Sequence, residues 1–112
     1  RRAVMIYNRP SMHVDYSHNG MSDFICTFAN SFHIRNGLLH SHYMMRSNDA
    51  IHGANNDFAW ALYVQEKLAG DLKVEVGDLI WTASSLHVYE YHFSHIEELI
   101  HESMNEQTDS SY

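Results

Sequence analysis

The pair Asn36-Gly37 stands between two runs of β-prone residues, Phe24–Arg35 and Leu38–Met45. Asn-Gly is a preferred loop of a two-residue β-hairpin, because both loop positions need a positive φ angle. The two runs are therefore predicted to pair as antiparallel strands about this turn. Positions at equal distance from the turn face each other, so residue 26 is expected to pair with about residue 47. The hairpin alone thus places the thiol of Cys26 beside the pair Arg46-Ser47.

The rest of the chain alternates between apolar runs and turn residues. Apolar residues at helical spacing predict two helices, and β-branched or aromatic runs predict strands. The expected elements are a strand at Ala3–Tyr7, a turn at Asn8–Ser11, a loop at Met12–Asp23 with a turn at Asn19-Gly20, a helix from about Asn56 to Ala69 stopped by Gly70, a connector at Asp71–Gly77, a β-type segment at Asp78–Tyr91 interrupted at Ala83–Ser85, and a helix at His92–Met104. This pattern predicts an α+β fold with a mostly antiparallel sheet and two packed helices. We expect one domain over residues 1–104 and a polar, frayed tail over residues 105–112.

The composition limits the classes of protein to which the chain can belong. Its 112 residues suffice for one small domain, and a hydrophobic content of 45% supports a core. No apolar run is long enough to span a membrane, and no signal peptide is recognisable. The single cysteine excludes an internal disulfide and indicates a reducing compartment, so we expect a cytoplasmic protein. A net charge of −7 argues against a nucleic-acid surface, and the ten histidines show no firm zinc spacing, so no metal is expected.

Polar residues concentrate between the second hairpin strand and the first predicted helix. One interpretation is a solvated loop whose Asp57 caps the helix, and the other is a site for a small polar ligand. Arg46 and Ser47 together offer N–H donors and a hydroxyl, a combination that suits a phosphate group. A further pair, His87 and Tyr89, alternates along a predicted strand, so both rings face the same side. These two rings suit either a sugar hydroxyl or a half-buried sheet face.

Cys26 also has two interpretations. A cation beside a thiol favours the thiolate, which is the form that acts as a nucleophile, and the hairpin brings Arg46 close. A free cysteine is otherwise most often a buried structural residue. The residues alone leave both interpretations open.

Several motifs, taken together, resemble the thymidylate synthase family. They are, in chain order, Arg1-Arg2, Cys26-Thr27, Arg46-Ser47-Asn48-Asp49, Gly53, Asn56-Asp57, Trp81-Thr82 and His87-Val88-Tyr89. The stretches most similar to the deoxycytidylate hydroxymethylase branch of the family are Arg1–Tyr7, Arg9–Met12, Gly20–Phe24 and Ser85–Tyr89. The resemblance covers Arg1 to about Ile96 and implies the C-terminal portion of a thymidylate synthase-like fold. Because the chain opens inside a strand-like run without an initiator methionine, we expect it to be the later part of a longer protein.

The resemblance implies a covalent mechanism. Cys26 corresponds to the thiolate that adds to C6 of a pyrimidine nucleotide, after which C5 takes a one-carbon unit from the co-substrate 5,10-methylenetetrahydrofolate. Arg46 and Ser47 correspond to ligands of the nucleotide phosphate. Asp49 corresponds to a residue on the pyrimidine and folate side of the site.

The resemblance also implies a second subunit and a sugar site. Arg1 and Arg2 correspond to arginines that reach the phosphate bound by a partner subunit, which implies a homodimer. His87 and Tyr89 correspond to ligands of the sugar 3′-hydroxyl. No nucleic acid and no membrane is expected among the partners.

Position 57 separates the branches of the family. Thymidylate synthases carry Asn there, which donates to O4 and accepts from N3–H of uracil, whereas this chain has Asp57. A carboxyl group accepts from the N4 amine of cytosine and can share a proton with N3. The resemblance therefore implies a cytidine monophosphate as the substrate, with dCMP favoured by the hydroxymethylase branch, and its 5-hydroxymethyl derivative as the product. The residues alone leave ribose and deoxyribose both open. Thr27, where thymidylate synthases usually have His, agrees with the hydroxymethylase branch.

Two alternatives stay open. The first is a thymidylate synthase that methylates dUMP. The second is an inactive nucleotide-binding fragment, because the family's catalytic glutamate and a phosphate-binding loop would precede Arg1. The family's C-terminal segment, which closes over folate, is also not recognisable in this chain.

Overall fold

The computed structural model describes residues 2–15, 17 and 25–109. Its elements, in chain order, are β1 (Arg2–Ile6), α1 (Met12–Asp15), β2 (Thr27–Arg35), β3 (Leu38–Met45), β4 (Asn48–Asp49), α2 (Ala54–Leu72), β5 (Glu75–Ala83), β6 (Leu86–His87), a 3-10 turn η1 (Glu90–His92) and α3 (Phe93–Asp109). Arg1, Phe24 and the turn expected at Asn19-Gly20 lie outside the described residues.

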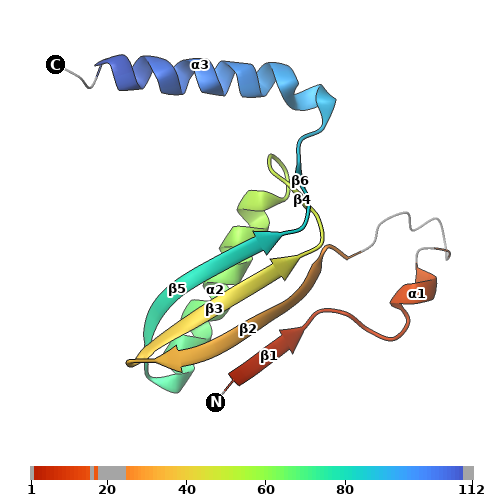
Figure 1. The fold of residues 1–112 in the computed structure, drawn as a ribbon, viewed down its shortest axis with the longest axis vertical. Helices are drawn as coiled ribbons and strands as arrows, with labels where there is room; N and C mark the ends of the chain where they lie inside the picture. Colours follow the sequence, from red (N-terminus) through yellow and green to blue (C-terminus); the bar gives the residue numbers. More distant parts are fainter. Residues whose placement is uncertain (1, 16, 18–24, 110–112) are drawn as a thin grey trace.

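Four strands form one sheet in the order β1-β2-β3-β5, and α2 covers one face of it (Figure 1). The pairs β1–β2 and β2–β3 are antiparallel, whereas β5 runs parallel to β3. A parallel neighbour needs a crossover that carries the chain back along the sheet, and α2 is that crossover. β4 and β6 form a separate parallel pair beyond the ends of β3 and β5 (Figure 1). The α+β class is confirmed, with one parallel pairing in the main sheet.

The β2–β3 hairpin turns at Asn36 and Gly37, whose φ angles are 51° and 77°. Positive φ at both loop positions is the geometry that favours Asn-Gly, so the predicted hairpin is confirmed. β3 has the expected bounds, Leu38–Met45, whereas β2 begins at Thr27.

The hairpin register changes near the open end of the ladder. The pairing shifts by one residue between Thr27 and Ala29, which marks a β-bulge. Beyond it, the Arg46 N–H donates to the Cys26 carbonyl at 2.8 Å. Arg46 therefore lies opposite Cys26, in the place where a ladder without a bulge would put Ser47.

Helix α2 packs on the sheet through two clusters of buried side chains. One cluster contains Phe32, Leu39 and Ala69, and the other contains Tyr43, Met45 and Ala61. Every second residue of β3 is buried, because successive side chains of a strand point to opposite faces of the sheet. The face that carries Leu39, Tyr43 and Met45 thus receives the helix.

The end of α2 differs from the prediction. Gly70 was expected to stop the helix but lies inside it, and the helix continues to Leu72. Lys73 takes the left-handed conformation, with a φ angle of 55°. Its N–H donates to the Gly70 carbonyl at 3.1 Å, and the Val74 N–H donates to the Ala69 carbonyl at 3.0 Å. These two bonds satisfy carbonyls that a helix end otherwise leaves without donors.

A buried amide fastens α2 to the two central strands. Gln65 is fully buried, and its Nε2 lies 2.8 Å from the Leu39 carbonyl, 3.2 Å from that of Gly77 and 3.1 Å from that of Asp78. The β3–β5 register shifts at this point, so that Gly77 and Asp78 together face His40. Gln65 thus provides donors for backbone carbonyls at an irregular place in the ladder, where buried polar groups need partners.

Both ends of the chain depart from the prediction. Met12–Asp15 forms the short helix α1 within the stretch that was predicted to be a loop, and Asp15 pairs with Arg9 at 2.7 Å. Helix α3 extends to Asp109, beyond the expected end at Met104, so residues 105–109 are helical rather than frayed.

Helix α3 lies apart from the sheet (Figure 1), so the expectation of two packed helices is wrong for this helix. Apolar residues that line it, Phe93, Leu99, Ile100 and Met104, are exposed. Helical periodicity predicts that a helix has an apolar face but does not specify what covers that face. None of the described helices is long and apolar enough to cross a membrane.

The bulge in β5 predicts opposite effects for two glycine substitutions. A Cβ at Gly77 would lie 2.8 Å from Nδ1 of His40, a nitrogen that accepts a hydrogen bond from the Asp78 N–H at 3.1 Å. We expect Gly77→Ala to lower the free energy of unfolding by about 1–3 kcal/mol through overpacking. The matched control is Gly70→Ala, because a Cβ there meets nothing within 4 Å.

In the control, alanine should raise the free energy of unfolding by about 0.5–1 kcal/mol, through its better helix propensity. Urea denaturation followed by circular dichroism measures both effects. Equal stability changes in the two variants would contradict this account of the bulge.

Candidate functional site

The thiol and the guanidinium meet at the open end of the hairpin. Arg46 Nη2 lies 3.7 Å from Cys26 Sγ, and Arg46 Nε donates to the Ile25 carbonyl at 3.3 Å. Cys26 is partly buried and packs against the cluster that contains Tyr43. The predicted neighbourhood of Cys26 and Arg46 is therefore confirmed, and the bulge described above sets its geometry.

The short β4–β6 pair brings the segment after Arg46 against the segment that contains His87. Asn48 N–H donates to the Ser85 carbonyl at 2.8 Å, and Ala50 N–H donates to the His87 carbonyl at 2.9 Å. Ser47 Oγ then lies 3.4 Å from His87 Nδ1. A hydroxyl expected at a phosphate and a ring expected at a sugar are thus adjacent, as they would be around one nucleotide.

His87 and Tyr89 share one side of their segment, as their spacing predicts. Their rings meet edge to face, with centroids 5.1 Å apart. Only Leu86–His87 forms a strand, and Tyr89 follows with extended backbone angles of −79° and 142°. Tyr89 is half exposed.

Asp57 turns its carboxylate toward β4 and does not cap the helix. The cap position of α2 is Gly53, and no side chain bonds there. Instead, Asn48 Nδ2 donates to Asp57 Oδ2 at 2.6 Å. Burial raises the pKa of Asp57 above its ordinary value, and the bond from Asn48 offsets part of the rise. The helix-cap interpretation is therefore wrong.

Asn48 is a site residue to which the sequence reasoning assigned no role. It is almost fully buried, and besides Asp57 its Nδ2 contacts the Met45 sulfur at 3.2 Å. Its Oδ1 finds no donor among the described residues, although buried acceptors usually have one. The motif Arg46-Ser47-Asn48-Asp49 contained the residue, but only the β4 geometry shows that it faces Asp57.

Asp49 differs from Asp57 in its surroundings. Its Oδ1 accepts from the Ile51 N–H at 2.9 Å and from the His52 N–H at 3.3 Å. The bond from Ile51 is the main reason why the pKa of Asp49 is lowered. The pKa values of Asp49 and Asp57 are therefore shifted in opposite directions.

Comparison with known proteins gives the family. The profile of the thymidylate synthase family matches residues 1–110. The chain belongs to the thymidylate synthase family.

Within this family, the chain is 46% identical over 100 residues to the deoxycytidylate 5-hydroxymethyltransferases of Enterobacteria phages T4, T2 and T6. The match covers 83% of this chain and 41% of each phage protein, so the chain spans about two fifths of the length of these relatives. Thermostable thymidylate synthase A from Bacillus subtilis has a similar fold, with a TM-score of 0.66 and 24% identity. That match covers 84% of this chain and 32% of the solved chain.

Two buried hydroxyls lie next to the thiol in this thymidylate synthase family chain. Thr27 Oγ1 and the Tyr43 hydroxyl are 2.9 Å apart, and both residues are buried. Burial raises the pKa of Tyr43, so its hydroxyl stays protonated. Tyr7 packs edge-on against Tyr43, and its own hydroxyl accepts from Trp60 Nε1 at 2.9 Å. The side chain of Thr27, which follows Cys26, is thus held by Tyr43 of β3.

Two of the expected site residues cannot be placed with their side chains. Arg2 begins β1, where its backbone pairs with His33, and Arg1 lies outside the described residues. Their roles at a partner's phosphate stay predictions. In the part of the chain that the structure describes, no three His, Cys, Asp or Glu side chains gather as a metal site.

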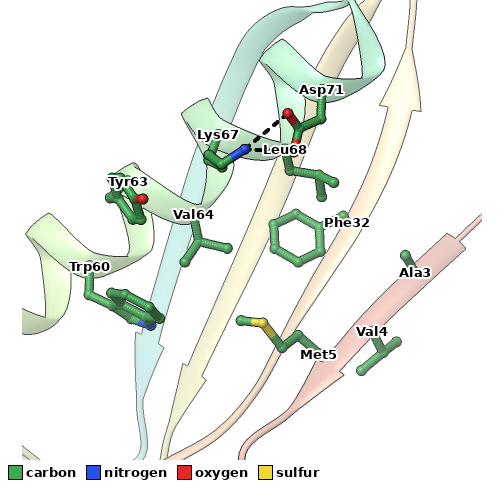
Figure 2. A pocket seen from close by; sticks show the side chains of 10 residues that line it. All are labelled: Ala3, Val4, Met5, Phe32, Trp60, Tyr63, Val64, Lys67, Leu68 and Asp71. Carbon is green, nitrogen blue, oxygen red and sulfur yellow. Dashed lines mark hydrogen bonds and ion pairs between the residues drawn. The ribbon is translucent and has the colours of Figure 1, made fainter.

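A hollow of about 420 Å³ lies between α2 and β1 (Figure 2). Cys26, Arg46 and Asp57 are not among the residues that line it. Its walls are mostly apolar, with Phe32 and Trp60 among them, and its one ammonium, on Lys67, is paired with Asp71 at 3.0 Å. It offers no cluster of donors for a phosphate. We therefore place the candidate nucleotide site at the ends of β3, β4 and β6.

The raised pKa of Asp57 predicts how stability depends on pH. In an unfolded chain an aspartate titrates at about 3.9, and in the folded protein the pKa of Asp57 is higher. The ionised carboxylate therefore costs folding free energy at neutral pH; this cost begins to fall as the pH drops through the folded-state value, and it is gone below the unfolded-state value of about 3.9. We expect Asp57→Asn to be more stable than the wild type at pH 7 and equally stable at about pH 3.

Thermal denaturation over that pH range measures the difference. Glu97→Gln, on the exposed surface of α3, controls for the loss of one carboxylate. A stability advantage of the Asp57→Asn variant that persists at low pH would contradict the assignment.

Proposed function

We propose that the protein containing this chain transfers a one-carbon unit to C5 of a cytidine monophosphate and forms the 5-hydroxymethyl nucleotide. The phage relatives that are 46% identical to this chain are deoxycytidylate 5-hydroxymethyltransferases, which supports dCMP as the substrate. The single observation that carries the proposal is the carboxyl group of Asp57. It lies partly buried beside Asn48, and its pKa is raised.

The nucleotide would bind along one line of residues. The guanidinium of Arg46 and the hydroxyl of Ser47 would hold the phosphate, because planar N–H donors and a hydroxyl suit its oxygens. His87 and Tyr89 would hold the sugar 3′-hydroxyl. The distance of 3.4 Å between Ser47 Oγ and His87 Nδ1 supports one ligand that spans both groups.

Asp57 would recognise the edge of cytosine. A protonated or proton-sharing carboxyl group can accept from the N4 amine and donate to the unprotonated N3. The raised pKa of Asp57 favours this form, and Asn48 Nδ2 holds one carboxyl oxygen in place. The Asn48 Oδ1, which has no donor among the described residues, offers a further acceptor for an amine.

Cys26 would act as the nucleophile. Its sulfur would form a bond to C6, and the electron pair of the C5–C6 double bond would move to C5. C5 would then bond to the one-carbon unit and lose its proton, the C–N bond between that unit and folate would break, and water would complete the hydroxymethyl group as the sulfur leaves C6. Arg46 Nη2 lies 3.7 Å from the sulfur and would hold it in place at the start and at the end of these steps.

The one-carbon donor would be 5,10-methylenetetrahydrofolate, which supplies a methylene group at the oxidation level of formaldehyde. Methylenetetrahydrofolate, water and the nucleotide give tetrahydrofolate and the hydroxymethyl nucleotide, so no hydride is transferred. Asp49 suits the folate side because its pKa is lowered and both backbone donors bind the same oxygen, Oδ1. Its Oδ2 can then accept from ring N–H groups.

The alternatives are less well supported. A thymidylate synthase acting on dUMP needs a donor to O4 of uracil, and the Asp57 carboxylate would face that oxygen. Such a mismatch of buried polar groups costs about 1–3 kcal/mol. An inactive nucleotide-binding fragment remains a formal alternative because the chain spans 41% of its phage relatives. Activity of the intact protein separates this alternative from the proposal.

The role of Asp57 predicts substrate choice. We expect the intact enzyme to prefer dCMP to dUMP by roughly 10⁴-fold in kcat/KM, because a site that bonds a base edge rejects the wrong base strongly. Asp57→Asn should shift this preference toward dUMP, since the amide replaces one acceptor with a donor at the same volume. Product analysis by chromatography, together with the absorbance of dihydrofolate, measures both outcomes.

The variant Cys26→Ala tests separately whether Cys26 is the nucleophile. It should abolish the covalent complex with a 5-fluoropyrimidine nucleotide and folate, and it should leave nucleotide binding within a few-fold. Turnover of dUMP by the wild type with a rise in dihydrofolate would identify a thymidylate synthase instead. A covalent complex that persists in Cys26→Ala would remove this residue from the mechanism.

We also propose a symmetric homodimer that forms through the sheet face opposite α2. That face exposes Val4, Ile6 and Ile80, whose side chains are more than half exposed. A hollow of about 400 Å³ lies there between Val4, His33 and Ile80. Exposed apolar groups over several strands are typical of an interface, and a two-fold interface would use the same face of both subunits.

A charge at Ile80, on the β5 side of this face, should separate the subunits. We expect the intact wild type to sediment as a dimer at micromolar concentration and Ile80→Glu to sediment as a monomer. Leu72→Glu, at the exposed end of α2, should remain dimeric. Sedimentation velocity gives the result, and a monomeric wild type would refute the proposed dimer.

A further inference from the structure

Two histidines from distant parts of the chain make a close contact beside the candidate site. Nε2 of His52 lies 2.7 Å from Nε2 of His92, and the ring centroids are 4.4 Å apart at an angle of 66°. His52 lies between Asp49 and helix α2, and His92 ends η1. At this distance one ring nitrogen donates a hydrogen bond to the other.

A continuous series of ring contacts joins this pair to the residues expected at the sugar. His87 meets Tyr89 with centroids 5.1 Å apart, and Tyr89 stacks on Tyr91 at 5.5 Å with an angle of 13°. Tyr91 in turn lies 4.4 Å from the ring of His92 and 6.4 Å from that of His52. A movement of His92 would therefore be transmitted to Tyr89 through packed rings.

The other member of the pair is fixed to Asp49. The His52 backbone N–H donates to Asp49 Oδ1 at 3.3 Å. The segment of Asp49 and the segment of His87 are joined in the ladder by β4 and β6, which have two residues each. So short a ladder constrains the two segments weakly, and the histidine contact adds a second point of attachment several residues away.

We infer that His52 and His92 form a pH-sensitive latch that positions His87 and Tyr89 relative to Asp49. We call this contact between the two imidazole rings the His52–His92 latch. The effect of the latch on nucleotide binding rests on the proposed function, which assigns His87 and Tyr89 to the nucleotide and Asp49 to folate. The latch itself rests only on the contacts described above.

The pH dependence follows from the number of protons between the rings. A closed latch holds one proton between the facing nitrogens, because one nitrogen must accept. When both rings are protonated, two like charges face each other, and the contact becomes repulsive. Acidification supplies the second proton, so the latch should be closed at pH 8 and should open as the pH falls.

Other charged or titratable groups also face the pair. Asp49 on the β4 side is held ionised by backbone bonds and lies within electrostatic reach of His52 and His87. Tyr91 packs against both rings, and Glu90 and His95 flank the segment of His92. Asp49 keeps its charge across this pH range, so the change near neutral pH comes from the imidazoles.

Amide hydrogen exchange tests the latch without any ligand. The Ala50 N–H donates to the His87 carbonyl at 2.9 Å, so its protection reports whether the two segments stay together. In the intact protein at pH 8, we expect His52→Ala to lower this protection factor roughly fivefold, the effect of one hydrogen bond of typical net strength. His52→Gln, which keeps a donor and an acceptor, should retain most of it.

The pH profile separates a latch from simple packing. Between pH 8 and pH 5.5, the wild type should lose protection at Ala50 relative to His52→Gln, because a single imidazole facing an amide cannot form the like-charge pair. His95→Gln, an exposed histidine on α3, should follow the wild type at both pH values. Unchanged protection at Ala50 in His52→Ala would overturn the latch.

Affinity for dCMP, measured by calorimetry at both pH values, then tests the positioning role. We expect His52→Ala to weaken binding about fivefold at pH 8, and wild-type affinity to fall toward that of the variant at pH 5.5. If His52→Ala lowers the protection of Ala50 but leaves the affinity for dCMP unchanged, the positioning role is overturned. If the wild type binds no pyrimidine nucleotide, the proposed function fails, while the exchange data still decide on the latch.

Discussion

The register of the β2–β3 ladder determines where the thiol and the guanidinium meet. Asn36 and Gly37 fix the register at the closed end of the hairpin, and the bulge next to Thr27 changes it by one residue at the open end. A shift of one residue turns a side chain to the other face of a strand, so this bulge decides which groups face each other. Arg46 therefore lies opposite Cys26, and the chain leaves β3 in the direction that lets β4 pair with β6.

Helix α2 completes the site because it is attached to the same two strands. Gln65 bonds carbonyls of Leu39, Gly77 and Asp78, which fixes the helix along β3 and β5. Asp57 lies two turns earlier on this rigid element, so its position follows from the docking of the helix. Its bond to Asn48 then connects the helix to β4. Two buried amides thus determine where the carboxyl group lies relative to the thiol.

Local signals predicted much of the fold and brought the main site residues together. The Asn-Gly turn, the strand at Leu38–Met45 and the helix expected from about Asn56 depend on neighbours in sequence, and each was confirmed. The bulge, the parallel pairing of β5 and the end of α2 depend on contacts between distant residues. Gly70 looked like a stop, but Lys73 provides the left-handed residue instead. Asn48 had no assigned role because its partner, Asp57, reaches it only after the helix has docked.

Two aspartates with opposite surroundings give the site its chemical asymmetry. Backbone N–H groups lower the pKa of Asp49, whereas burial raises that of Asp57. Where environments move the pKa values of two like groups apart, the groups are suited to different tasks. An ionised carboxylate accepts only, while one that holds a proton can also donate. Under the proposed function, cytosine presents both a donor at N4 and an acceptor at N3, and the raised pKa of Asp57 makes it the better suited of the two carboxyl groups to match both. Asp49 is suited to a ligand edge made of donors. The placement of the two groups, one on a helix docked by Gln65 and the other in the turn after β4, therefore supports cytosine on the α2 side of the thiol.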